Sequence, residues 1–196
     1  MREKTINPQS GLYAILGDPI SHSMSPVIMN SSFDRLGMDN VFLALKANLE
    51  TFDKVMPALK LMDFKGYVFT MPVKEAALPY MDELSNEARI IGAVNCAVNR
   101  DGILTGYNTD SIGFWTSVQA KNTEKLPIRR AFVMGAGGMA RAAVAQAALQ
   151  GVEEIVVANI MAHESFIRSF CCFLERIEAA CPAVRIRLLD WEPRLW

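Results

Sequence analysis

One stretch of the sequence, residues 131–140, restricts the fold more than any other. It reads Ala-Phe-Val-Met-Gly-Ala-Gly-Gly-Met-Ala, a short apolar run that ends in glycines and opens an alanine-rich segment. This order predicts a strand, a tight turn and a helix, and Gly135, Gly137 and Ala140 match the G-x-G-x-x-G/A pattern of dinucleotide-binding domains. A pyrophosphate would lie on the free N–H groups of the helix beginning near Gly138. The alternative is a glycine turn that binds nothing.

The segments on both sides of this stretch predict two α/β regions. Downstream, strands at 131–134, 155–158 and 184–189 alternate with helices at 138–150 and 163–180, which is half of a doubly wound sheet. Upstream, we expect strands at 11–16, 41–45, 66–70, 93–98 and 103–104. The expected helices there cover 25–36, 52–62, 74–81, 85–91 and 112–120, the first of them capped by Ser25. Asn99–Gly102 predicts a hairpin, so the upstream sheet is mixed.

The expected organisation is therefore a mixed-sheet α/β substrate-binding domain over residues 1–120, followed by the first half of a Rossmann domain over 121–196. The polar stretch 121–125 is the expected linker. Half a nucleotide-binding sheet leaves the edge at Phe132–Met134 uncovered, an aggregation hazard. The sequence therefore favours a C-terminally truncated fragment over a chain whose edge a partner covers.

Composition excludes several classes of function. A net charge of -1 gives no general attraction to nucleic acid, and no apolar run approaches the roughly 20 residues of a membrane span. Four cysteines without C-x-x-C spacing and only two histidines argue against a metal site. The N-terminus does not read as a signal peptide, so we expect a cytoplasmic protein.

Polar residues at strand and helix ends are the candidates for chemistry. Ser23 and Ser25 flank a helix N-terminus, where hydroxyls suit a carboxylate, although Ser25 can equally be a helix cap and Ser23 a loop residue. Lys74 follows a strand, where open α/β sheets place ligands, but a single lysine is usually a surface charge. Asp110 is either part of another helix cap or a carboxylate paired with Lys74.

Five motifs in order resemble the shikimate dehydrogenase family. They are ISHSMSP at 20–26, GYVFTMPVK at 66–74, GAVN at 92–95, GYNTDSIGF at 106–114 and GAGG at 135–138. The resemblance covers residues 11–160. It implies an NAD(P)-dependent oxidoreductase that interconverts 3-dehydroshikimate and shikimate in the chorismate pathway of aromatic amino acid biosynthesis. Tyr107, before Asn-Thr-Asp, resembles the quinate/shikimate branch, which adds quinate as a substrate.

The resemblance also assigns roles by position. The substrate carboxylate and ring hydroxyls would be held by Ser23, Ser25, Thr70, Asn95 and Asp110. Lys74 and Asp110 would be catalytic: the ammonium of Lys74 stabilises charge on the reacting oxygen and supplies the proton, and Asp110 keeps Lys74 charged. The cofactor would contact Gly135, Ala136, Gly137, Gly138, Met139 and Asn159. The implied partners are small molecules, with a homodimer as a further expectation.

Three departures from the family pattern bear on function. Val68 replaces an asparagine that many members carry. Ile160 and Met161 follow Asn159 where an arginine would grip a 2′-phosphate, and no acidic residue ends that strand, so the sequence leans slightly to NAD. Family members also continue past residue 196. The alternatives to an active dehydrogenase are therefore a catalytically dead fragment, a substrate-binding module that keeps only the carboxylate site, and a different nucleotide enzyme.

Overall fold

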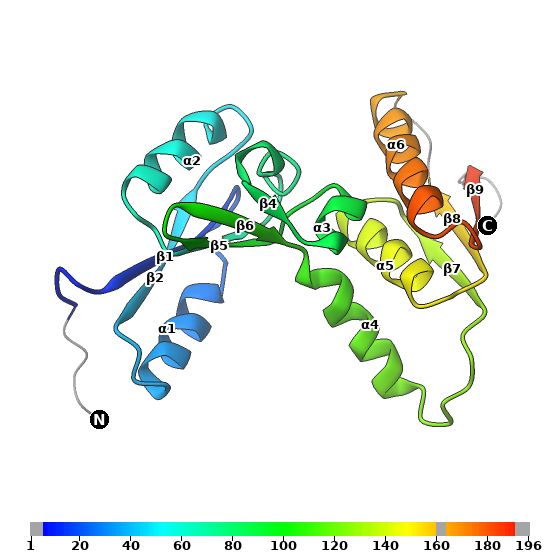
Figure 1. The fold of residues 1–196 in the computed structure, drawn as a ribbon, viewed down its shortest axis with the longest axis horizontal. Coiled ribbons are helices and arrows are strands. Elements are labelled where there is room, and N and C mark those ends of the chain that lie inside the picture. Colours follow the sequence, from blue (N-terminus) through cyan, green and yellow to red (C-terminus); the bar gives the residue numbers. More distant parts are fainter. Residues whose placement is uncertain (1–5, 160–163, 191–196) are drawn as a thin grey trace. The chain divides into compact units, whose positions relative to one another are not determined.

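The computed structural model describes residues 6–159 and 164–190, without the side chains of 164–167 (Figure 1). Its larger sheet has six strands: β1 (Gly11–Gly17), β2 (Asn40–Lys46), β3 (Gly66–Phe69), β4 (Glu83–Leu84), β5 (Cys96–Arg100) and β6 (Ile103–Tyr107). The strand order is β2-β1-β3-β5-β6-β4. Strand β1 runs parallel to β2 and β3, whereas β5 runs antiparallel to both β3 and β6. The expected mixed sheet is confirmed.

Two helices cover opposite faces of this sheet. Helix α1 (Ser25–Arg35) places Phe33 in a cluster with Ile15 and Phe42. Helix α2 (Phe52–Leu61) places Phe52 edge-on against Phe69, with ring centroids 6.0 Å apart. Ile15 pairs with Val68, and the next residue along each strand, Leu16 and Phe69, faces the other side, because side chains alternate along a strand. Each apolar face of the sheet is therefore buried by one helix.

Two local predictions about this region were wrong, and a third, the hairpin, is confirmed with a shorter loop. The helix expected at 74–81 is a series of turns followed by a 3₁₀ helix at Leu78–Tyr80, and Pro79 disfavours an α-helix there. Ser25 is the first residue of α1 and not its cap; the Ser23 Oγ accepts the Ser25 N–H at 3.3 Å instead. The hairpin loop is shorter than expected, since Asp101 and Gly102 both have positive φ and join the strands directly.

The smaller sheet is parallel, as the sequence predicts. It contains β7 (Arg130–Met134), β8 (Glu154–Asn159) and β9 (Arg185–Asp190) in the order β7-β8-β9. Helices α5 (Gly138–Leu149) and α6 (Glu164–Ala180) connect these strands. Within the described residues β7 pairs with β8 alone and forms one edge, where Phe132 and Met134 are 58% and 71% exposed.

The chain divides into two compact units that interleave in sequence. The first contains residues 1–85 and 93–107, and the second contains 86–92 and 108–196. Helix α3 (Asn86–Ile91) and helix α4 (Thr109–Lys121) therefore belong with the smaller sheet. The chain passes between the units at 85/86, 92/93 and 107/108, whereas the sequence suggested a single boundary at 121–125. The functional domain ranges 1–120 and 121–196 stay a prediction.

Candidate active site and nucleotide-binding turn

The C-terminal ends of β1 and β3 are held close together in the first unit. The Thr70 N–H donates to the Leu16 carbonyl at 2.9 Å, and the Asp18 N–H donates to the Met71 carbonyl at 3.1 Å. A Cβ on Gly17 would lie 2.3 Å from the Thr70 Cγ2 and 2.8 Å from the Met71 carbonyl oxygen. Only glycine fits this approach, which brings the loop after β1 beside the loop after β3.

The loop after β1 carries both candidate serines. Ser23 precedes α1 and Ser25 begins it, and both residues are half-buried, whereas Met24 between them is 61% exposed. The first N–H groups of a helix lack partners within the helix, and its N-terminus carries partial positive charge. The two hydroxyls therefore lie where an anionic group is stabilised.

Lys74 and Asn95 are tied to each other through the main chain. The Val94 N–H donates to the Lys74 carbonyl at 2.9 Å, while the Asn95 N–H donates to the Tyr107 carbonyl at 2.9 Å. The Asn95 carbonyl in turn accepts the Phe69 N–H at 2.8 Å. Asn95 is only 8% exposed and Lys74 is half-buried. These bonds place Lys74 and Asn95 at the end of the sheet that also carries Thr70.

Asp110 is the one candidate substrate residue in the second unit. It lies in the first turn of α4, where a carboxylate interacts favourably with the helix dipole, three residues after β6 ends at Tyr107. Asn108 is the N-cap residue of α4, without a side-chain capping bond. The structure thus brings the first-unit candidates to one sheet end. The pairing of Asp110 with Lys74 spans the two units and stays a prediction.

The glycine turn of the second unit has the backbone that a nucleotide-binding turn requires. Gly135 has a φ of 94°, which disfavours other residues, and its N–H donates to the Ala158 carbonyl at 2.7 Å. Gly137 is the N-cap residue of α5, and Gly138 begins that helix. A Cβ on either would meet no atom of the described residues within 4 Å. Packing within the protein therefore does not require glycine at 137 or 138, whereas the close approach of a ligand would.

The remaining candidate cofactor-binding residues, Ala136, Met139 and Asn159, differ in exposure and in their place around this turn. Ala136 is fully buried and acts through its backbone, while Met139 is 57% exposed at the start of α5. Asn159 is the last residue of β8 and is half-buried. Residues 160 and 161, on which the choice between NAD and NADP was based, lie outside the described residues.

Arg141 donates a hydrogen bond to the backbone of the glycine turn, and the sequence analysis did not identify it. It is 5% exposed, and its Nε donates to the Ala136 carbonyl at 3.4 Å. Its guanidinium also donates to the Ser169 Oγ at 3.1 Å and lies over the rings of Phe170 and Phe173, 5.7 and 6.0 Å from their centroids. The signal was a single charged residue within an otherwise apolar helix start.

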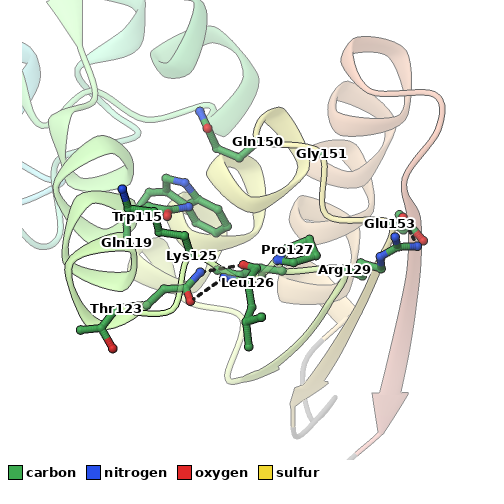
Figure 2. Close-up of a pocket in the computed structure, with 12 residues that line it drawn as sticks. Trp115, Gln119, Thr123, Lys125, Leu126, Pro127, Arg129, Gln150, Gly151 and Glu153 are labelled. Atoms are coloured by element: carbon green, nitrogen blue, oxygen red, sulfur yellow. Dashed lines mark hydrogen bonds and ion pairs between the residues drawn. The ribbon is translucent and has the colours of Figure 1, made fainter.

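A cavity of about 730 Å³ lies elsewhere in the second unit. Figure 2 shows Trp115, Gln119, Leu126 and Gln150 around it, together with the ion pair between Arg129 and Glu153 at 3.5 Å. Its lining comes from α4 and from the residues just before β7 and β8, at the N-terminal ends of these strands. Open parallel sheets bind ligands at the opposite, C-terminal ends, where the glycine turn lies. The cavity is therefore separate from the glycine turn.

Two absences among the described residues bear on the excluded functions. Within 6–159 and 164–190, no three histidine, cysteine, aspartate or glutamate residues are grouped so that they could hold a metal ion. Over the same part of the chain, no helix has the length and apolar character needed to cross a membrane.

The fold and the glycine turn define the class: an α/β protein with a mixed-sheet unit joined to a Rossmann-type unit. Residues 15–97 match the shikimate dehydrogenase substrate binding domain. The chain is 43% identical over 148 residues to the shikimate dehydrogenase (NADP(+)) of Bacillus mycoides strain KBAB4, covering 76% of this chain and 53% of that protein. These similarities support assignment of the chain to the shikimate dehydrogenase family.

Solved structures agree with this assignment. The shikimate 5-dehydrogenase of Listeria monocytogenes in complex with shikimate and NAD has a TM-score of 0.84 and 32% identity, over 96% of this chain and 64% of that one. The shikimate 5-dehydrogenase of Thermus thermophilus in complex with NADP(H) and shikimate has a TM-score of 0.74 and 30% identity, over 92% and 63%. The chain spans about half the length of the curated relatives it matches.

Proposed function

We propose that this chain binds shikimate at the strand ends of its first unit and a nicotinamide dinucleotide at the glycine turn of its second. The reaction proposed is the reversible oxidation of shikimate to 3-dehydroshikimate, with quinate as a further substrate. The observation that carries the proposal is the convergence of two hydroxyls, a buried amide and a half-buried lysine on one end of the mixed sheet. The relatives solved with shikimate and with NAD or NADP(H) support it.

The polar groups in the first unit suit a small hydroxylated acid. Ser23 and Ser25 offer hydroxyl donors beside the α1 N-terminus, which favours a carboxylate. The Asn95 side chain can both donate and accept, as the Thr70 hydroxyl can, so each can bind a ring hydroxyl. Because Asn95 is buried, a hydrogen bond that it forms with a ring hydroxyl would be shielded from water.

Lys74 is the proposed proton donor and acceptor. When the substrate is a ketone, negative charge develops on its oxygen, and a positioned ammonium stabilises that charge and delivers a proton to the oxygen. In the reverse direction the amine takes the hydroxyl proton. Asp110 is proposed to keep Lys74 oriented, and the partial burial of Lys74 strengthens its electrostatic effect relative to a lysine in water.

The glycine turn fits a dinucleotide because space lies open over Gly137 and Gly138 at the start of α5. The nicotinamide, when bound, supplies or accepts the hydride. The curated relatives are named for NADP(+) and do not support the lean to NAD, while one solved relative holds NAD. We therefore propose both dinucleotides as ligands and leave their ranking to measurement. The proposed location is the cytoplasm.

The first test measures shikimate binding to the whole chain by isothermal titration calorimetry and by the rise in melting temperature. We expect Lys74→Ala to weaken binding about tenfold, the effect of losing one charge-assisted hydrogen bond. Lys54→Ala is the matched control, since Lys54 is an exposed lysine on α2. Absence of shikimate binding by the wild-type chain would refute the substrate assignment.

The second test addresses the cofactor with Gly137→Ala. A methyl group at 137 meets no atom within 4 Å in the part of the chain that the structure describes, so we expect an unchanged melting temperature but weaker binding of NAD and NADP. Steady-state assays with shikimate and quinate, each with both dinucleotides, then measure turnover. Shikimate binding without nucleotide binding or turnover would refute the dehydrogenase and leave a substrate-binding module.

Sedimentation equilibrium tests the homodimer, which stays a prediction.

A further inference from the structure

A side chain of α6 contacts the end of α3, far away in the sequence. The Arg176 Nε donates to the Ile90 carbonyl at 2.9 Å, and its Nη2 donates to the Ile91 carbonyl at 3.4 Å. The last carbonyls of a helix have no partner within the helix, and arginine side chains commonly satisfy them. Arg176 therefore fixes the C-terminal turn of α3 to α6 within the second unit.

The same guanidinium determines what can occupy position 92. Gly92 has a φ of 72°, a left-handed conformation that other residues adopt at a cost. A Cβ there would lie 2.4 Å from the Arg176 Nη2 and 3.0 Å from its Cζ. The turn that ends α3 is thus held from two sides, by its own backbone conformation and by the arginine packed against it.

This turn leads directly into the proposed substrate site. Immediately after Gly92 the chain passes into the first unit, where Ala93 and Val94 are buried. The Val94 N–H donates to the Lys74 carbonyl, and the next residue, Asn95, immediately precedes β5. The path from Arg176 to the proposed catalytic lysine therefore consists of one turn, one crossing between the units and one main-chain hydrogen bond.

We infer that Arg176 is a positioning residue for Lys74 and Asn95, acting through the Gly92 turn. It touches neither substrate nor cofactor. Its role is to fix the start of segment 92–95, so that the Val94 amide and the Asn95 side chain keep their places. This inference rests on the proposed function for its effect on shikimate. Its effect on the backbone of segment 92–95 can be measured without any ligand.

The ligand-free test is amide hydrogen exchange of the whole chain, followed by NMR. We expect Arg176→Ala to speed exchange at Gly92 and Val94 at least tenfold, while Val157 in the centre of β8 is unchanged. Arg185→Ala is the matched control, because Arg185 is an exposed arginine on β9 in the same unit. Unchanged exchange at Gly92 and Val94, or equal acceleration at Val157, would overturn the inference.

The second test is a double-mutant cycle on the dissociation constant for shikimate. Arg176→Ala is expected to weaken shikimate binding about tenfold, because a displaced Lys74 would lose its charge-assisted hydrogen bond to the ligand. The dissociation constant for NADP is expected to stay unchanged. Gly92→Ala is expected to weaken shikimate binding less in the Arg176→Ala background than alone, since the clashing guanidinium is gone. Additive effects, or equal weakening of shikimate and NADP binding, would overturn the inference.

The conservative variant Arg176→Lys separates the effect of charge from the effect of geometry. It also keeps the inference testable if Arg176→Ala folds poorly. A lysine ammonium is a point donor and cannot match the fork of a guanidinium. We expect it to retain the melting temperature and to restore shikimate binding only in part. Full restoration would show that charge alone suffices and would overturn the geometric role. If the wild-type chain does not bind shikimate, the proposed function fails, and amide exchange alone decides the role of Arg176.

Discussion

Replacement of Gly17 by alanine tests how closely the two loops of the proposed substrate site approach each other. The added Cβ would lie 2.8 Å from the Met71 carbonyl oxygen, a backbone atom, and 2.3 Å from the Cγ2 of the stiff, β-branched Thr70. Neither can move without shifting the end of β3. Overpacking of this kind typically costs about 1–3 kcal/mol of unfolding free energy. For a chain of this size each kcal/mol lowers the melting temperature by roughly 2–4 °C.

Gly11→Ala, on the same strand, is the matched control. Its Cβ would lie 2.5 Å from the Asn40 Oδ1, but that atom ends a side chain that can rotate away, and the next neighbours are 3.5 Å or more away. We therefore expect a cost of less than about 1 kcal/mol, as for a substitution that meets only a movable side chain. Urea unfolding of both variants and shikimate titration provide the measurements. A Gly17→Ala variant that is as stable as Gly11→Ala, with unchanged shikimate affinity, would refute the reasoning.

Two further predictions concern pH. The pKa of Asp82 is lowered from its ordinary value of 3.8, first by the hydrogen bond from the Leu104 N–H and then by Lys60. The Asp82 carboxylate therefore stabilises the fold above about pH 4, and this contribution is lost as the pH falls through the lowered pKa. The difference in urea midpoint between wild type and Asp82→Asn should accordingly shrink from pH 7 to pH 3, and a constant difference would contradict this. Burial, assisted by Asp63, raises the pKa of Tyr67 from 10.0 to about 12, so stability falls as pH rises from 10 to 12 while the unfolded chain ionises. Tyr67→Phe removes a buried hydroxyl without a hydrogen-bond partner in the described residues, and its urea midpoint should fall less steeply in that range; parallel curves would count against the assignment.

Most elements were predictable because each carries its own local signal. The apolar runs of β1 and β8, the stop at Gly37 after α1 and the glycine turn before α5 all lie within a few residues of the feature that they specify. Where such signals conflicted, the prediction failed. The stretch 74–81 has helix-forming residues, and Pro79 disfavours a continuous α-helix there, although α2 accommodates Pro57.

The features that could not be predicted depend on contacts between distant residues. Nothing within Asn86–Ile91 indicates that α3 belongs with strands that begin some forty residues later. Arg176 resembles any arginine of an amphipathic helix until its contact with α3 is seen. The candidate substrate residues of the first unit were found from motif order alone, and the structure adds the strand-end hydrogen bonds that bring them together.

The chain crosses between the two units three times, and this affects both its folding during translation and its division into separate fragments. The bond from Arg176 to Ile90 spans 86 residues, so α3 emerges from the ribosome roughly 4–17 s before its partner at ordinary rates of translation. During that interval the C-terminal turn of α3 lacks its arginine. No single cut in the gene separates the units either, because a fragment that starts after residue 107 omits α3. Exchange of the second unit between relatives by recombination therefore requires the short segment 86–92 to be exchanged with it.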